Sequence, residues 1–224
     1  MEDPVSDHSP SGSGQGRALT MHLLPTQDEV VGVLRETGAL RDGHFESPDG
    51  IHSNEYLQTP LVMRNYQHAR TLNVGLSRLL RSNSEIRANI AELSIVAPAT
   101  GGLPVAYGVC EALRAKQVYW AERDAEDKPL RFRQFVSPEP GEQVILVDDI
   151  LRSGKKLSEM QTLLEQSGAR VVGLAVLIYQ PNPHTWDFGK LPLYYLAKLS
   201  ASYYATAADC DLCKQGVPVQ KVWI

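Results

Sequence analysis

Residues 144–157 read Val-Ile-Leu-Val-Asp-Asp-Ile-Leu-Arg-Ser-Gly-Lys-Lys-Leu, and this stretch decides the fold. The four apolar, mostly β-branched residues at its start predict a fully buried strand of a parallel sheet. The apolar spacing of Leu157, Met160, Leu163 and Leu164 predicts that a helix follows. A turn from strand to helix lies at the carboxyl edge of a parallel sheet, where ligands bind.

The polar turn between this strand and this helix predicts a site for an anion. Asp148 and Asp149 are expected to end the strand, where adjacent carboxylates can bind two hydroxyls or contact a metal ion. Arg152, Lys155 and Lys156 crowd the start of the helix, where the helix dipole disfavours cations, and a bound anion would resolve that conflict. Two plainer interpretations stay open: a charged, solvated loop, or acids placed only for their favourable charge near the helix start.

Two other phosphate-binding motifs are excluded. A Walker loop needs a glycine five residues before its Gly-Lys pair and a Ser or Thr after the pair, but Asp149 and Lys156 hold these positions. The chain also lacks the glycine fingerprint of dinucleotide-binding proteins.

The composition is that of a soluble protein with one sizeable core. The chain has 224 residues, 43% hydrophobic and 21% charged, and no apolar run long enough to span a membrane. The net charge of -4 and the pI near 5.9 exclude a broad nucleic-acid surface and favour a small anionic substrate. Three cysteines, Cys110, Cys210 and Cys213, with no secretory signal favour a reducing cytoplasm.

The order of elements along the chain predicts an α/β protein. Residues 1–19 are expected to be a disordered extension, and residues 20–224 a single domain with its core at about 66–200. Thr26 and Glu29 form a capping box for a first helix. Residues 38–60 are too short to own a core and are expected to lie against the main sheet as a lid. Strands are expected at 94–97, 118–121, 144–147 and 171–178, with helices between them and a hairpin at 130–135. Such alternation predicts a doubly wound, mainly parallel sheet flanked by helices.

Further stretches carry a family resemblance. Residues 37–40 read Thr-Gly-Ala-Leu, residues 43–45 Gly-His-Phe and residues 50–53 Gly-Ile-His-Ser, and the tail has Cys-x-x-Cys at 210–213 and Gly-Val-Pro at 216–218. Together with residues 144–157, these sequence motifs resemble those of the type I phosphoribosyltransferases, in particular the bacterial-type orotate phosphoribosyltransferases. The resemblance implies a small N-terminal hood, made of residues 38–60 and the C-terminal tail, and a flexible catalytic loop after residue 122.

The resemblance also implies a reaction and its residues. The reaction would be the Mg²⁺-dependent transfer of ribose 5-phosphate from phosphoribosyl pyrophosphate to a nucleobase, orotate (giving orotidine 5'-phosphate) or a related base. Mg²⁺ would be held mainly by the substrate, so no protein ligand is assigned, and the family is typically homodimeric. The implied catalytic residues are Arg123, Asp148 and Asp149. The implied phosphate and pyrophosphate contacts are Ala99, Thr100, Gly101, Gly102, Arg152, Ser153, Gly154, Lys155 and Lys156. The implied nucleobase neighbours are Phe45, His52, Ser53 and Tyr56.

The chain departs from the family pattern at several positions. The phosphate loop usually reads Thr-Thr-Gly-Gly-Ser/Thr, whereas residues 152–156 read Arg-Ser-Gly-Lys-Lys. Pro48 and Gln180 stand where the family has basic residues near orotate, and Arg123 stands where it usually has Lys, which keeps the charge but changes its shape. A second hypothesis therefore stays open, in which the protein binds phosphoribosyl pyrophosphate or a nucleotide as a regulator without turnover.

The Cys-x-x-Cys pair of the tail favours reduced structural thiols over a metal site. A structural zinc needs four ligands, and Cys110 is the only other thiol. No histidine stands near Cys210 or Cys213 in the sequence.

Overall fold

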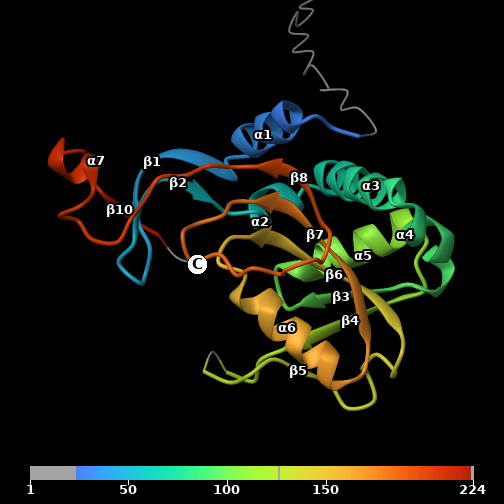
Figure 1. Cartoon of the computed structure of the whole chain (residues 1–224). Coiled ribbons are helices and arrows are strands. Elements are labelled where there is room, and N and C mark those ends of the chain that lie inside the picture. Colours follow the sequence, from blue (N-terminus) through green and yellow to red (C-terminus); the bar gives the residue numbers. More distant parts are fainter. Residues whose placement is uncertain (1–23, 126, 223–224) are drawn as a thin grey trace, which may run out of the picture.

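The computed structural model describes residues 24–125 and 127–222, and its main element is a six-stranded sheet (Figure 1). The extension expected at residues 1–19 lies outside the described residues. The strands run in the order β5-β4-β3-β6-β7-β8, and all neighbours are parallel except the antiparallel pair of β4 and β5. The strands are β3 (Ser94–Pro98), β4 (Gln117–Glu122), β5 (Arg131–Phe132), β6 (Gln143–Leu151), β7 (Arg170–Tyr179) and β8 (Leu193–Lys198).

Helices cover both faces of this sheet. Ile145 and Val147 of β6 are buried on one face, against the core formed with α1 (Gln27–Glu36), α3 (Tyr66–Ser82) and α5 (Gly102–Leu113). Val144 and Leu146 are buried on the opposite face, against α6 (Lys155–Gln166). A strand buried on both faces must be apolar at successive positions, and this is why its sequence shows an unbroken apolar run. The predicted doubly wound α/β fold is confirmed.

Local signals in the sequence place several of the helices. Thr26 caps α1 as predicted, with Glu29 N donating to Thr26 Oγ1 at 3.3 Å and Thr26 N donating to Glu29 Oε2 at 2.8 Å. Gly38 follows the helix with a φ of 69°, which glycine adopts without steric cost. The remaining short helices are α2 (Pro60–Met63), α4 (Ser84–Asn89), the 3-10 helix η1 (Ile90–Glu92) and α7 (Asp211–Lys214).

Strand β6 is longer than the sequence predicted. The expectation that Asp148 and Asp149 end the strand is wrong, because β6 continues to Leu151 and stays paired with β7 through Asp148↔Val176 and Leu151↔Tyr179. The two acids therefore lie within the strand, and the turn to α6 is correspondingly short. Strand β8 was not anticipated from the sequence.

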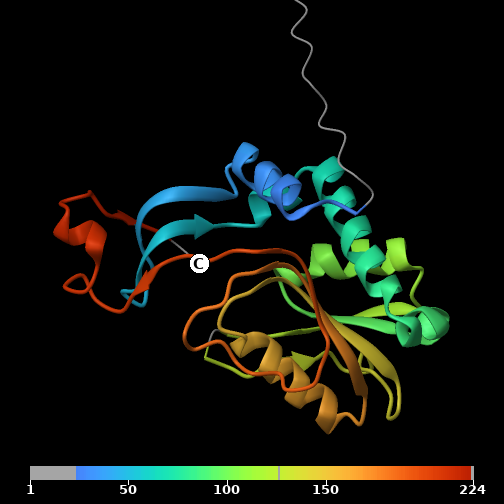
Figure 2. The same ribbon diagram turned by 45° about the horizontal axis from the view of Figure 1, so that its top comes forward.

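A second sheet of four strands forms the hood. Its order is β10-β1-β2-β9, with β1 (Leu40–Glu46) and β2 (His52–Leu57) antiparallel, β9 (Tyr203–Tyr204) beside β2, and β10 (Gln220–Lys221) parallel to β1. Figure 2 shows this hood sheet beside the main sheet, with α7 at its outer end. The hood thus combines two strands from residues 40–57 with two short strands from the C-terminal part of the chain. None of the described helices is long and apolar enough to cross a membrane.

Candidate functional site

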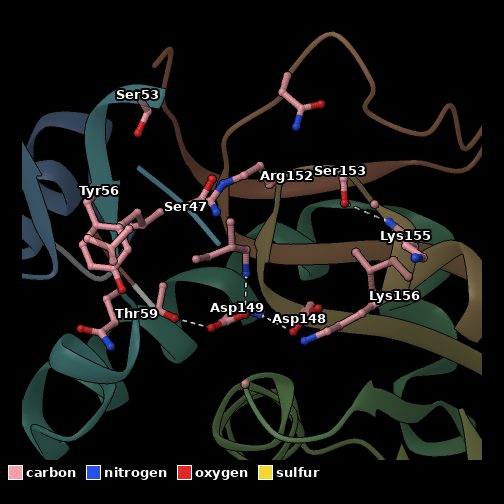
Figure 3. A pocket seen from close by; sticks show the side chains of 18 of the residues that line it. Ser47, Ser53, Tyr56, Thr59, Asp148, Asp149, Arg152, Ser153, Lys155 and Lys156 are labelled. Carbon is pink, nitrogen blue, oxygen red and sulfur yellow. Dashed lines mark hydrogen bonds between the residues drawn. The ribbon is translucent and has the colours of Figure 1, made fainter. Parts of the chain in front are cut away.

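A cavity of about 510 Å³ lies between the hood and the carboxyl edge of the main sheet (Figure 3). Strand β3 has β4 on one side and β6 on the other, so the chain order reverses between them, and ligands bind at such switch points. The lining comes from β2 and the turn after it, from β9 and the end of β6, from the turns β3–α5 and β6–α6, and from the loops after β1, β7 and β10. The lining residues used below are Ser53, Glu55, Tyr56, Thr59, Ala99, Gly101, Asp148, Asp149, Arg152, Ser153, Gly154, Lys155, Lys156, Asn182, Tyr203 and Val222.

The two acids of β6 are held at the floor of this cavity. Asp149 N donates to Asp148 Oδ1 at 2.9 Å, and Ile150 N donates to Asp149 Oδ1 at 2.8 Å. The Thr59 hydroxyl donates to the Asp149 carboxylate. Burial, together with the adjacent charge of Asp149, raises the pKa of Asp148 well above its ordinary value. Helix α6 begins only at Lys155, so the acids do not act as charges at a helix start.

The β3–α5 turn approaches these acids closely because it contains two glycines. A Cβ at Gly101 would lie 3.0 Å from Asp149 Oδ2, and one at Gly102 would lie 3.1 Å from Asp148 Oδ1. Ala99 and Gly101 line the cavity, as expected for two of the four predicted pyrophosphate contacts. Thr100 and Gly102 belong to the same turn but are not among the lining residues.

The β6–α6 turn leads directly into the start of a helix, the end of a helix that favours anions. Gly154 is the N-cap of α6 with a φ of 76°, and a Cβ there would also lie 3.0 Å from Trp186 Cβ. The Lys155 N–H donates to Ser153 Oγ at 3.4 Å, while Gly154 offers no side chain to the N–H groups that follow in the first turn, where an anion is favoured. Ser153, Lys155 and Lys156 line the cavity beside this turn. The turn and the two acids thus lie beside the same cavity, and the binding of a phosphate there stays a prediction.

Arg152 belongs to the same turn but is oriented toward the hood, as Figure 3 shows. Its Nη2 and Nε donate to Gln180 Oε1 at 3.0 and 3.2 Å, and Gln180 Nε2 donates to Glu55 Oε2 of β2 at 3.5 Å. Burial raises the pKa of Tyr203 on β9, and the nearby positive charge of Arg152 partly opposes that rise. The guanidinium is thus connected to side chains of the hood.

Arg123 lies outside the cavity lining. It follows β4 directly, and its guanidinium pairs with Glu159 of α6, with Nη1 3.2 Å from Oε1. The structure therefore brings Asp148 and Asp149 together with the β6–α6 turn, but it does not bring Arg123, the third predicted catalytic residue, to the cavity.

The four predicted nucleobase neighbours divide into two pairs. Ser53 and Tyr56 line the cavity. Phe45 packs behind Tyr56, with ring centroids 5.6 Å apart, and does not line the cavity. His52 is 5% exposed, and its Nδ1 lies 3.5 Å from Cys213 Sγ instead. We assign no base contact to Phe45 or His52. Pro48 is likewise absent from the lining.

Several lining residues were missed in the sequence. Thr59 precedes Pro60 at the first position of α2, and this helix-start signal could have drawn attention to it. Glu55, Asn182, Tyr203 and Val222 carry no comparable local signal, because only the tertiary structure brings their segments to the cavity.

Comparisons with known proteins agree with this geometry. A family model described as phosphoribosyl transferase domain matches residues 65–187. The chain is 35% identical over 186 residues to the orotate phosphoribosyltransferase of Carboxydothermus hydrogenoformans, covering 83% of this chain and 92% of that one. It is 34% identical over 189 residues to that of Thermotoga maritima, covering 84% and 94%.

Solved structures show the same fold. The orotate phosphoribosyltransferase from Aeropyrum pernix has a TM-score of 0.59 at 20% identity, covering 76% of this chain and 93% of that one. A phosphoribosyltransferase from Corynebacterium diphtheriae has a TM-score of 0.56 at 20% identity, with coverage of 77% and 95%. The chain belongs to the type I phosphoribosyltransferase family, together with the orotate phosphoribosyltransferases that it matches over most of their length.

Proposed function

We propose that this enzyme transfers ribose 5-phosphate from phosphoribosyl pyrophosphate to orotate. The observation that carries the proposal is the single cavity in which two adjacent carboxylates, a cationic turn at a helix start and the hood face one another. The carboxylates suit the ribose hydroxyls, the cationic turn suits a phosphate, and the hood can cover a planar base. The printed names of the relatives support orotate as the base.

The cavity residues act by binding and orienting the substrate. The bond from the ribose C1 to pyrophosphate breaks as the bond from C1 to the base nitrogen forms, and glycosyl transfer places positive charge on the sugar. Asp149, oriented by Thr59, accepts hydrogen bonds from the ribose hydroxyls beside that charge. Asp148, next to it in the cavity lining, offers a second carboxyl group to the same hydroxyls. Ser153, Lys155, Lys156 and the start of α6 bind the 5-phosphate, while the β3–α5 turn, with Ala99 and Gly101 at the cavity, binds the pyrophosphate.

Arg152 supplies the cation that orotate requires. The base carries a carboxylate, and a guanidinium is its best partner because it can donate two parallel hydrogen bonds. Pro48 and Gln180 provide no charge, but Gln180 holds Arg152 on the hood side of the cavity. We therefore assign Arg152 to the base rather than to the 5-phosphate.

Arg123 is proposed to neutralise the departing pyrophosphate after the loop that follows β4 closes. This step requires its guanidinium to leave Glu159, an ion pair in which both side chains are partly exposed. Both side chains keep about a quarter of their surface exposed, so a pyrophosphate can reach the guanidinium and compete with Glu159 for it.

The donor set of the cavity fits Mg²⁺. Mg²⁺ prefers oxygen ligands and is commonly bound by one or two carboxylates together with substrate phosphates, which Asp148 and Asp149 allow. When bound, Mg²⁺ would neutralise charge on the pyrophosphate.

The test is an assay with phosphoribosyl pyrophosphate, Mg²⁺ and a panel of nucleobases. We expect pyrophosphate release with orotate and none with adenine, uracil or hypoxanthine. The reaction is monitored through the change in the absorbance of orotate. Binding of phosphoribosyl pyrophosphate without release by any base would support the regulator hypothesis instead. The absence of any thermal shift with phosphoribosyl pyrophosphate would contradict both.

We also propose a homodimer in the cytoplasm. Tyr66 of α3 and Tyr107 of α5 are 71% and 55% exposed on helices that pack together, which suits a surface covered by a second copy. The three cysteines are free, as a reducing compartment would keep them. Light scattering after size-exclusion chromatography would test the dimer.

A further inference from the structure

Four potential metal ligands meet at the outer end of the hood, away from the catalytic cavity. His44 lies on β1, His52 on β2, and Cys210 and Cys213 flank the start of α7. One ligand atom from each residue lies within 4.8 Å of the others. Figure 1 shows α7 and β10 beside β1 at this end of the molecule. We call these four residues the His–Cys cluster.

Three nitrogen–sulfur distances within the cluster match the edges of a zinc tetrahedron. His44 Nε2 lies 3.4 Å from Cys210 Sγ and 3.6 Å from Cys213 Sγ, and His52 Nδ1 lies 3.5 Å from Cys213 Sγ. With Zn–S near 2.3 Å and Zn–N near 2.0–2.1 Å, tetrahedral geometry requires edges of roughly 3.3–3.8 Å. The two histidine nitrogens, 2.8 Å apart, need to separate only slightly.

A backbone carbonyl sets the tautomer of one histidine for metal binding. Val217 O lies 2.7 Å from His44 Nδ1, and a carbonyl can only accept, so Nδ1 carries the proton. Nε2 of His44 therefore directs a lone pair at the other three ligand atoms. An imidazole oriented through its second nitrogen by a carbonyl is the usual arrangement around bound zinc.

Three of the four cluster residues are shielded from solvent, which suits a structural metal site. His44 is 3% exposed, His52 is 5% and Cys210 is 0%, while Cys213 is half-buried. A lone pair on His44 Nε2 can accept only one proton well, yet three potential partners surround it within 3.6 Å. A cation at the centre satisfies all four groups together, whereas hydrogen bonds alone leave some of them poorly paired.

We propose that His44, His52, Cys210 and Cys213 bind one structural Zn²⁺ that fastens the C-terminal tail to the hood. Two thiolates and two imidazoles form a Cys₂His₂ set, which favours zinc over oxygen-seeking Mg²⁺. The fastened tail continues into β10, which pairs with β1 at Phe45↔Gln220, and then to Val222 in the cavity lining. The metal would thus hold one wall of the cavity without contacting the substrate.

The direct test uses Zn²⁺ and Co²⁺ as probes on the full chain, purified under reducing conditions. We expect about one equivalent of zinc per chain by elemental analysis. Co²⁺ should replace it with the visible bands of tetrahedral cobalt and a thiolate charge-transfer band in the near ultraviolet. This spectrum is measured on the unaltered chain, so it stays informative if ligand variants fail to fold.

Matched variants identify the ligands. Cys213→Ser and His52→Asn should lower bound zinc to below about a tenth of an equivalent. Cys110→Ser, which removes the half-buried thiol outside the cluster, and His184→Asn, which removes an exposed histidine, should keep the full equivalent. Equal loss of zinc from Cys110→Ser and Cys213→Ser would overturn the assignment.

Amide hydrogen exchange tests whether the metal fastens the C-terminal tail to the hood. Chelation of zinc in the intact chain, without substrate or Mg²⁺, should speed amide exchange at least tenfold in residues 40–57 and 203–222 while leaving β6 unchanged. Three results would overturn the proposal: less than about a tenth of an equivalent of zinc with no cobalt spectrum, a Cys210–Cys213 disulfide in the freshly purified chain, or unchanged exchange after zinc removal.

Discussion

The acidic floor of the cavity and the His–Cys cluster are both groups of polar side chains in one enzyme, but they are assembled differently. Asp148, Asp149 and the phosphate turn follow one another within a single strand, turn and helix. His44 and Cys210 are separated by 166 residues, and the hood strands β1 and β10 bring them together. On β2, Ser53 lines the cavity while the adjacent His52 contacts the cluster, as alternating strand side chains allow.

This difference predicts which property of the enzyme a substitution in each region should impair. Changes in the contiguous region should affect turnover, because its side chains line the cavity in which we propose that the sugar and phosphates bind. Changes in the cluster should affect the order of the hood, because its side chains face away from the cavity. The following predictions test that division, beginning with the largest expected effect.

Asp149→Ala should lower kcat/KM by about 10²-fold or more, because it removes the carboxylate that Thr59 orients toward the ribose. Steady-state assays with phosphoribosyl pyrophosphate and orotate measure this loss. Asp28→Ala, an exposed acid in the first turn of α1, is the control and should change little. Turnover of Asp149→Ala within about twofold of the unaltered enzyme would remove Asp149 from the site.

Arg123→Ala should lower kcat by about 10- to 10²-fold and leave the KM for the base nearly unchanged, because its charge is needed by the leaving pyrophosphate. Glu159→Gln is the matched control, since it removes the ion-pair partner and keeps the guanidinium. A rise in the KM for the base with an unchanged kcat would place Arg123 outside the chemical step.

Arg152→Ala tests a residue that belongs to the phosphate turn in sequence and to the hood in space. We expect the KM for orotate to rise about tenfold and the KM for phosphoribosyl pyrophosphate to change less, because the lost hydrogen bonds are those to the carboxylate of the base. Lys155→Ala should show the opposite selectivity. The same selectivity in both variants would return Arg152 to the 5-phosphate.

Asp148→Asn should raise the melting temperature at neutral pH while lowering activity. The raised pKa of Asp148 means that the folded state binds its proton more tightly than the unfolded chain does. The stability from that proton is present at low pH and is lost as the pH rises through the raised pKa. The melting temperature of Asp148→Asn should therefore exceed that of the unaltered protein by an amount that grows from about pH 4 toward neutral pH. Each kcal/mol of added stability corresponds to roughly 2–4 °C.

Thermal melts of both proteins without Mg²⁺ or substrate check this, and the difference between the two curves isolates Asp148 from other titrating groups. Glu142 titrates in the opposite sense, because hydrogen bonds from Ser94 and other neighbours outweigh its burial and lower its pKa. A difference that shrinks as the pH rises would contradict a raised pKa for Asp148.

Much of the fold could be predicted because its signals are local. The apolar run of β6, the capping box of α1 and the apolar spacing of α6 lie within a few residues of one another, and each matched the structure. The strand end was misplaced because Asp148 and Asp149 are polar, while their backbone still pairs with β7. Backbone pairing with a distant strand depends little on side-chain type, so the residue types of Asp148 and Asp149 do not reveal it.

The sequence by itself determined the β6–α6 unit, its two acids and the turn that we propose binds an anion, because contiguous residues fold into one strand, turn and helix. Only the tertiary structure decided that Arg152 reaches the hood, that Phe45 and His52 do not line the cavity, and that two histidines meet the Cys-x-x-Cys pair. The physical reason is that these contacts depend on how β1, β2 and the tail pair into one sheet. Pairing between segments so far apart follows from the packing of the whole chain.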